Sequence, residues 1–137
     1  MAGKSKREKI TGRREKPTFV GIPMIVMDSP AYCRLGGWDV KLLMDIARQY
    51  NGYNNGDLCA AWKTMKPKGW NSKGTLNRAL QTLQELGFVE QTRQGGRNRC
   101  SLFSLTWQPI DECKGKLDVS PTQTPSNRYR TAHLRAA

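Results

Sequence analysis

The side chains best suited to chemistry lie between positions 71 and 81, where amide, hydroxyl and guanidinium groups recur at the spacing of one helix face. Arginine can donate two hydrogen bonds to the O6 and N7 atoms of guanine, and asparagine or glutamine can pair with the N6 and N7 atoms of adenine. The residues that we expect to reach the bases of a duplex are Asn71, Gly74, Thr75, Asn77, Arg78 and Gln81. The pattern predicts a helix that enters a major groove.

Gly74 is the unusual member of this set, because glycine in a helix costs roughly 1 kcal/mol relative to alanine. Its lack of a side chain leaves room for the helix backbone to approach DNA closely. The alternative is that Gly74 is a tolerated weak point near the start of the helix. The sequence is compatible with both interpretations.

Cationic side chains surround this segment. Lysine is a flexible point charge that suits contacts with phosphate better than contacts with bases. The residues that we expect to contact phosphates are Lys63, Lys66, Lys68, Ser72 and Lys73. The alternative is a solvated basic face without a partner.

A second polar group flanks the glycine pair at positions 95 and 96 and consists of Arg93, Arg97, Asn98 and Arg99. Arginines at the tip of a hairpin can enter a minor groove or contact the DNA backbone. The alternative is that they keep an exposed hairpin soluble and prevent pairing of its edges. We favour DNA contact, because this group follows the proposed base-reading segment directly in the chain.

Catalytic and metal-binding patterns are absent from the sequence. Cys33, Cys59, Cys100 and Cys113 are separated by 26, 41 and 13 positions, so no pair has the C-x-x-C spacing typical of zinc sites. We expect structural cysteines with free thiols. His133 is the only histidine, and no glycine-rich phosphate loop is present. We therefore expect no enzyme activity, no metal and no cofactor.

Hydrophobic spacing predicts the elements that position these residues. A helix from Trp38 to Tyr50 carries apolar residues on one face and ends at Asn51-Gly52. A short helix is expected over residues 58–65, before Pro67. A third helix, between two candidate N-caps at positions 71 and 72 and a glycine stop at position 87, has the clearest period. Its expected core residues are Leu76, Ala79, Leu80, Leu83 and Leu86.

Two β-prone segments, residues 88–94 and 99–107, follow the third helix and predict a hairpin. Residues 18–27 are also β-prone, but Pro23 restricts them to an edge strand at best. Of the four tryptophans, Trp70 is the one that we expect to be exposed. The expected fold class is mainly α with a small β-hairpin.

Charge is concentrated in two parts of the 137-residue chain, whose net charge is +12. Residues 1–17 carry seven basic and two acidic side chains, and residues 62–107 carry eight basic and two acidic ones. Such a surface attracts polyanions. Because the sequence has neither a run of about 20 apolar residues nor the apolar region of a secretory signal, we expect a cytoplasmic protein that does not enter a membrane.

Composition divides the chain into three parts. Residues 1–17 hold almost no large apolar side chain, which predicts a disordered basic arm. Residues 110–137 include a run rich in Ser, Thr, Gln and Asn with two prolines, which predicts a flexible C-terminal tail. The folded domain is expected to span residues 18–109.

Three helices followed by a hairpin, with basic charge from the second helix onward, is the order of a winged helix-turn-helix. The stretch from Asn71 to Val89 resembles the recognition helix of winged-helix regulators, which runs directly into the hairpin called the wing. More narrowly, residues 29–32, 47–56 and 105–109 resemble small helix-turn-helix proteins of phages, prophages and plasmids. This resemblance, over about residues 28–111, implies a winged-helix fold and sequence-dependent DNA binding.

The expected function is sequence-dependent binding of double-stranded DNA, by a transcriptional regulator or a protein that binds a replication origin. The alternative is a phage-type interaction protein or inhibitor that uses the same basic face on a protein or RNA. A protein partner that binds through the tails fits either class. The DNA sequence and the oligomeric state stay open.

Overall fold

The computed structural model describes residues 17–135. The predicted basic arm therefore lies outside the described residues except for Pro17. The helices are α2 (Met24–Met27), α3 (Pro30–Cys33), α4 (Gly37–Ala47), α5 (Trp62–Met65), α6 (Lys73–Glu85) and α7 (Ala132–Arg135), with 3-10 turns η1 (Lys66–Lys68), η2 (Cys113–Gly115) and η3 (Arg128–Arg130). The strands are β1 (Leu58–Cys59), β2 (Val89–Arg93) and β3 (Leu102–Leu105).

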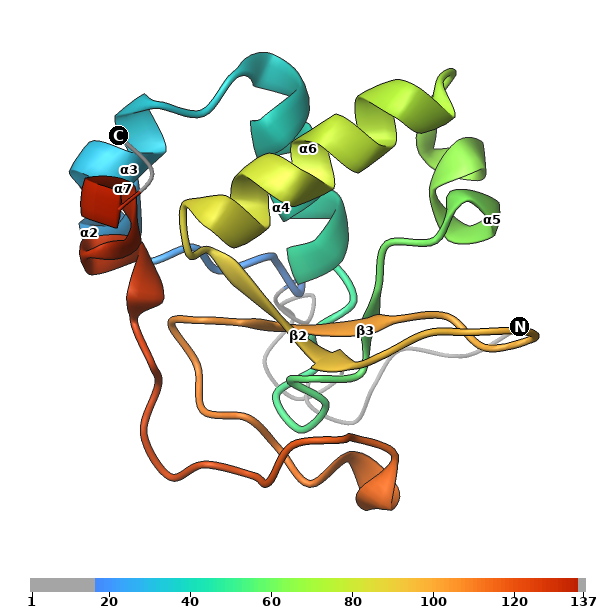
Figure 1. Cartoon of the computed structure of the whole chain (residues 1–137). Coiled ribbons are helices and arrows are strands. Elements are labelled where there is room, and N and C mark those ends of the chain that lie inside the picture. Colours follow the sequence, from blue (N-terminus) through green and yellow to red (C-terminus); the bar gives the residue numbers. More distant parts are fainter. Residues whose placement is uncertain (1–16, 136–137) are drawn as a thin grey trace, which may run out of the picture.

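The strands form one antiparallel sheet in the order β1-β3-β2. Helices α4 and α6 pack against each other on one side of this sheet, and the chain that follows β3 runs along the other side (Figure 1). Fully buried side chains of α4, α6 and the sheet, such as Leu43, Leu83 and Leu105, form one core. The expectation of helices with a small hairpin is confirmed at this level, and a third strand adds to it.

Helix α6 forms where the period predicts it. The Ser72 hydroxyl accepts a hydrogen bond from the Thr75 backbone N–H at 3.2 Å, which satisfies one unpaired donor of the first turn. At the other end, Gly87 has a φ of +79°. Phe88 N donates to the Leu83 carbonyl and Gly87 N donates to the Gln84 carbonyl, the two bonds of a Schellman cap. The stripe faces the core, although Leu80 is only half-buried.

The start of the predicted second helix is wrong. Leu58 and Cys59 form β1, which pairs with Phe103 and Leu102 of β3, and the helix begins only at Trp62. The outer edge of β1 is satisfied by a side chain, because the Gln49 amide accepts from Cys59 N at 2.9 Å and donates to the Cys59 carbonyl at 2.7 Å. Backbone pairing thus outweighs the helical preference of this segment.

The predicted edge strand over residues 18–27 is also wrong. Residues 17–23 are irregular, and a single helical turn, α2, follows. The Pro23 carbonyl accepts from Val26 N at 3.0 Å, and the turn buries the Val26 side chain. No strand of the described chain pairs with this segment, so its β propensity has no partner to act on.

Residues 110–135 differ from the expected flexible tail, because they pack against the sheet and the helices. Tyr129 is only 1% exposed and stacks on Phe88 with ring centroids 5.8 Å apart. Backbone hydrogen bonds join Asp118 N to the Thr92 carbonyl and Asn127 N to the Thr106 carbonyl, each at 2.8 Å. One buried aromatic ring and these backbone bonds order a segment whose composition is polar.

Candidate nucleic-acid interface

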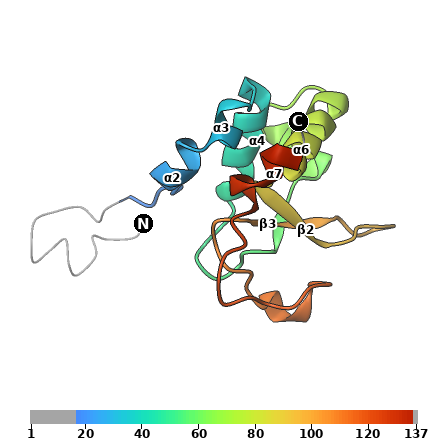
Figure 2. The ribbon, with the colours of Figure 1, turned by 60° about the vertical axis from the view of Figure 1, so that its left-hand side comes forward.

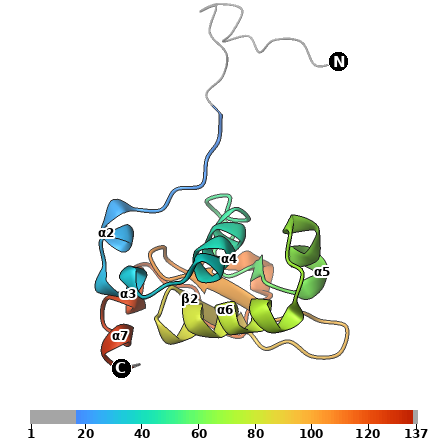
Figure 3. The same ribbon diagram turned by 90° about the horizontal axis from the view of Figure 1, so that it is seen from above.

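Three segments bring cationic side chains to one end of the molecule. These are α5 with η1, the first half of α6, and the loop between β2 and β3 (Figures 1 and 3). Helix α2 lies at the opposite end (Figure 2). The polar residues predicted to contact DNA that are exposed in these segments and around the start of α6 are Lys63, Lys66, Lys68, Asn71, Ser72, Lys73, Asn77, Arg78, Gln81, Arg97, Asn98 and Arg99. We call this set the basic face.

The turn between η1 and α6 is anchored by Trp70, which is 1% exposed rather than exposed as predicted. Its Nε1 atom donates a 2.9 Å hydrogen bond to Oδ2 of Asp45 on α4. The same oxygen pairs with Nζ of Lys41 at 3.1 Å, and Lys41 also donates to the Lys68 carbonyl at 2.9 Å. The ring packs against Trp38 at 5.0 Å between centroids. This network holds the basic turn on α4 and so sets the direction of α6.

Arg78 lies along the first turns of α6. Its Nη2 atom donates to the Thr75 hydroxyl at 3.3 Å. A β-carbon placed on Gly74 would stand 3.4 Å from Nη1 of Arg78, so the missing side chain leaves space for the guanidinium. Thr75 is half-buried, whereas Gly74 and Arg78 are exposed. The arrangement presents one planar donor group close to an open stretch of helix backbone, a geometry suited to a base edge.

The other predicted base-reading residues surround Arg78. Asn71 and Asn77 are exposed, at the start and on the side of the helix. Gln81 is exposed but donates to Oε1 of Glu85 at 3.1 Å, so reaching a base requires it to leave this i,i+4 contact. The structure therefore places five of the six predicted positions on α6 and the sixth, Asn71, directly before its N-cap, Ser72.

The predicted hairpin group divides into two roles. Arg93 is half-buried, and its Nη2 donates to the Cys100 carbonyl at 2.8 Å across the hairpin, which makes it a brace between the two strands. Arg97 and Asn98 stand at the exposed tip, where Asn98 has a φ of +60°. Arg99 forms an ion pair with Asp118 at 3.6 Å. The group therefore comprises a half-buried brace, an ion-paired arginine and two residues at an exposed tip.

Charge compensation on the basic face is sparse. The described residues form three ion pairs, Lys41–Asp45, Arg99–Asp118 and Lys116–Asp57, and of these only the second involves the basic face. The four lysines predicted to contact phosphate have no acidic partner within the described chain. A basic surface with few internal counter-charges attracts an extended polyanion.

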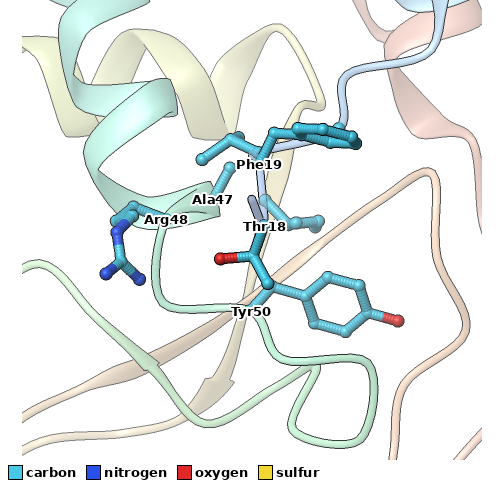
Figure 4. Close-up of a pocket in the computed structure, with 8 residues that line it drawn as sticks. Thr18, Phe19, Ala47, Arg48 and Tyr50 are labelled. Atoms are coloured by element: carbon cyan, nitrogen blue, oxygen red, sulfur yellow. The ribbon is translucent and has the colours of Figure 1, made fainter. Parts of the chain in front are cut away.

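One hollow of the described chain is lined by residues that do not belong to the basic face. The one in Figure 4 has a volume of about 250 Å³ and lies where residues 18–21 cross the end of α4, lined by Arg48 and Tyr50 among others. Sites for drug-sized ligands span roughly 300–1,000 Å³ and have convergent polar groups. This hollow is smaller, and its lining offers a single cation.

Two cysteine thiols of the described chain have raised pKa values. Burial, together with the neighbouring Cys59 thiol, raises the pKa of Cys100. Burial, together with nearby aspartates, raises the pKa of Cys113. Both shifts disfavour the nucleophilic thiolate. Within the part of the chain that the structure describes, no three His, Cys, Asp or Glu side chains are grouped so that they could hold a metal ion. None of the helices described there could span a bilayer.

The sequence does not predict the burial of Trp70 or the ion pair between Asp118 and Arg99. Trp70 stands between a glycine and an asparagine in a basic turn, a context that predicts exposure.

A comparison of the chain with family models, with curated proteins and with solved structures finds no match. The basic face is therefore interpreted from its own geometry.

Proposed function

We propose that the chain is a winged helix-turn-helix protein that binds double-stranded DNA in a sequence-dependent manner. The element order α4-β1-α5-α6-β2-β3, with the sheet order β1-β3-β2, supports this fold. In it, α5 and α6 are the two helices of the helix-turn-helix, and the β2–β3 loop is the wing. Helix α6 lies in the major groove, with Arg78 at a base edge.

The observation that carries the proposal is the joint exposure of Arg78, the α5–η1 lysines and the wing tip at one end of the molecule, without acidic partners in the described chain for Arg78 and the lysines. Lysines next to α6 contact phosphates and fix the register, and Arg78 supplies discrimination between bases. We further propose a cytoplasmic role at a promoter or a replication origin.

The test is selection of the full chain on random duplexes at several salt concentrations, followed by affinity measurements on the selected site and on unrelated DNA. Arg78→Ala should cost about 1–3 kcal/mol on the selected site and much less on unrelated DNA. Arg48→Ala is the matched control, because it removes the same charge from an exposed position at the far end of α4. Arg48→Ala should change the affinity for the selected site and for unrelated DNA by the same factor.

Equal losses on both sequences for Arg78→Ala make Arg78 a phosphate contact and remove it from base reading. If no duplex is enriched at any salt concentration, the proposal fails. The same basic face is then assigned to a protein or RNA surface, as expected for an interaction protein or inhibitor.

A further inference from the structure

Residues 116–118 pack against the base of the wing on the side of the sheet opposite the helices, and we call these three residues the clasp. Lys116 forms an ion pair with Asp57 at 2.9 Å. Leu117 packs against Gly56, where an added β-carbon would lie 2.7 Å from the leucine Cδ1 atom. The carbonyl of Gly56 in turn accepts from the buried Thr92 hydroxyl at 2.6 Å. The clasp is thus built into the loop before β1 and into β2.

Asp118 is the end of this clasp and makes three contacts with the wing. Its backbone N–H donates to the Thr92 carbonyl at 2.8 Å. Oδ2 accepts from Gln94 N at 2.8 Å, and Oδ1 lies 3.6 Å from Nη2 of Arg99. Thr92 belongs to β2, and the contacts with Gln94 and Arg99 reach both sides of the loop between β2 and β3.

The wing needs such support because its own ladder is irregular there. The pairing of β2 with β3 shifts register between Gln91 and Arg93. The ladder ends with the Arg93–Leu102 pair, and beyond it an isolated bridge joins Gly96 to Arg99. A two-stranded ribbon alone is marginally stable in water. Gln94 directly follows Arg93, the last residue of β2. Its backbone N–H donates to the Asp118 carboxylate instead of to a neighbouring strand.

We infer that Asp118 positions the wing relative to α6 and thereby determines the base preference at the DNA positions that the wing tip reaches. This inference rests on the proposed DNA binding, and it concerns a positioning residue, since Asp118 acts through Gln94 and Arg99. A wing held at one angle places Arg97 over one part of the duplex. A wing without the Asp118 contacts moves over several parts of the duplex, so Arg97 contacts different base pairs and the base preference at each is lost.

The hydrogen bond to Gln94 carries more of this effect than the ion pair, because ion pairs between half-exposed side chains contribute little. Asp118→Asn keeps an oxygen that can accept from Gln94 N and loses the charge. Asp118→Ala loses both. Glu112→Ala is the matched control, since it removes one exposed carboxylate from the same segment six residues earlier.

Two measurements on the full chain test the inference. Amide hydrogen exchange of residues 93–101 should become about tenfold faster in Asp118→Ala, much less in Asp118→Asn, and not at all in Glu112→Ala. Selection on random duplexes should retain the part of the motif lost in Arg78→Ala. The flanking preference, defined as the part lost in Arg97→Ala, should disappear in Asp118→Ala.

Unchanged exchange in Asp118→Ala overturns the inference, whatever the DNA result. Faster exchange with an intact flanking preference also overturns it, because the wing angle then does not affect base choice. If Glu112→Ala also loses the flanking preference, removal of a negative charge is responsible rather than the contacts of Asp118, and the inference is overturned as well. If the wild-type chain selects no motif, the proposed function fails, and exchange alone decides whether Asp118 positions the hairpin.

Discussion

The indole N–H of Trp70 and the carboxylate of Asp45 join the turn before α6 to helix α4 through a 2.9 Å hydrogen bond. Since Trp70 is 1% exposed, the bond lies where water competes weakly. The α5–α6 turn is therefore attached to the core by one aromatic side chain, and the basic face inherits its orientation from that attachment.

Trp70→Phe removes this hydrogen bond and part of the ring volume. We expect a loss of about 1–3 kcal/mol in the free energy of unfolding, measured by urea denaturation, because the half-buried Asp45 carboxylate loses one of its two donors and the core loses part of the ring. Trp38→Phe is the control, since Trp38 packs against the same ring but is 48% exposed. Equal and small effects of the two variants contradict the anchoring role.

Gly74→Ala separates the two interpretations of this glycine. Alanine should raise the free energy of unfolding by roughly 1 kcal/mol through helix propensity. We expect affinity for the selected DNA site to fall for two reasons. The new β-carbon lies 3.4 Å from Nη1 of Arg78, and it covers helix backbone that would otherwise approach the DNA. Gly37→Ala, at the start of α4 with nothing within 4 Å, is the control. A more stable variant with unchanged affinity makes Gly74 a tolerated weak point.

The sequence predicts α6 well because its signals are local. The cap at Ser72, the apolar period and the glycine at position 87 all lie within sixteen residues, and each acts through neighbouring backbone. The half-buried Leu80 is the one departure, because the stripe is slightly wider than the surface that α4 and the sheet cover. The predicted base-reading positions follow from the same helical phase.

Other features depend on partners distant in the chain. Strand β1 has two residues, too few to show any period, and it exists because β3 pairs with it. Tyr129 is one aromatic residue in a polar segment, and its burial depends on Phe88, forty-one positions away. Asp118 reaches the wing through a path that no local pattern encodes. Composition alone therefore underestimates how far the folded domain extends.

Stability should fall at alkaline pH because three groups have raised pKa values. Burial raises the pKa of Tyr50, Cys100 and Cys113, and nearby aspartates add to the effect on Tyr50 and Cys113. A group with a raised folded pKa stabilises the fold below its unfolded pKa, and this contribution is lost as pH rises through the folded pKa. For the thiols, whose unperturbed pKa is about 8.5, the loss begins near that pH.

Urea denaturation between neutral pH and about pH 10 measures this dependence across the thiol and phenol ranges. Cys100→Ala and Cys113→Ala should each flatten the fall of the unfolding free energy in the lower part of this range, and Tyr50→Phe in the upper part. Cys33→Ala is the control, because Cys33 is exposed. A fall of the same steepness in all four variants shows that other groups cause it.

Gly87 should tolerate alanine far less well than Gly52, although both have a positive φ, +79° and +98°. Each substitution places an L-residue in the left-handed region, at about 1–2 kcal/mol. At Gly52 the new β-carbon meets nothing within 4 Å, whereas at Gly87 it would stand 2.7 Å from the carbonyl carbon of Arg128. The backbone of residues 128–129 must then move, and Tyr129 leaves its stack on Phe88.

We therefore expect Gly87→Ala to exceed Gly52→Ala by at least the roughly 1 kcal/mol that a disturbed aromatic contact is worth, measured as the difference in unfolding free energy. Truncation after Pro109 provides an independent comparison, because it removes Tyr129 altogether. If Gly87→Ala is destabilised chiefly by losing this packing, the truncated chain should be strongly destabilised, and Gly87→Ala within it should cost no more than Gly52→Ala. If Gly87→Ala still costs more unfolding free energy than Gly52→Ala in the truncated chain, the clash does not involve residues 110–137. That result contradicts the role of the C-terminal segment as part of the folded domain.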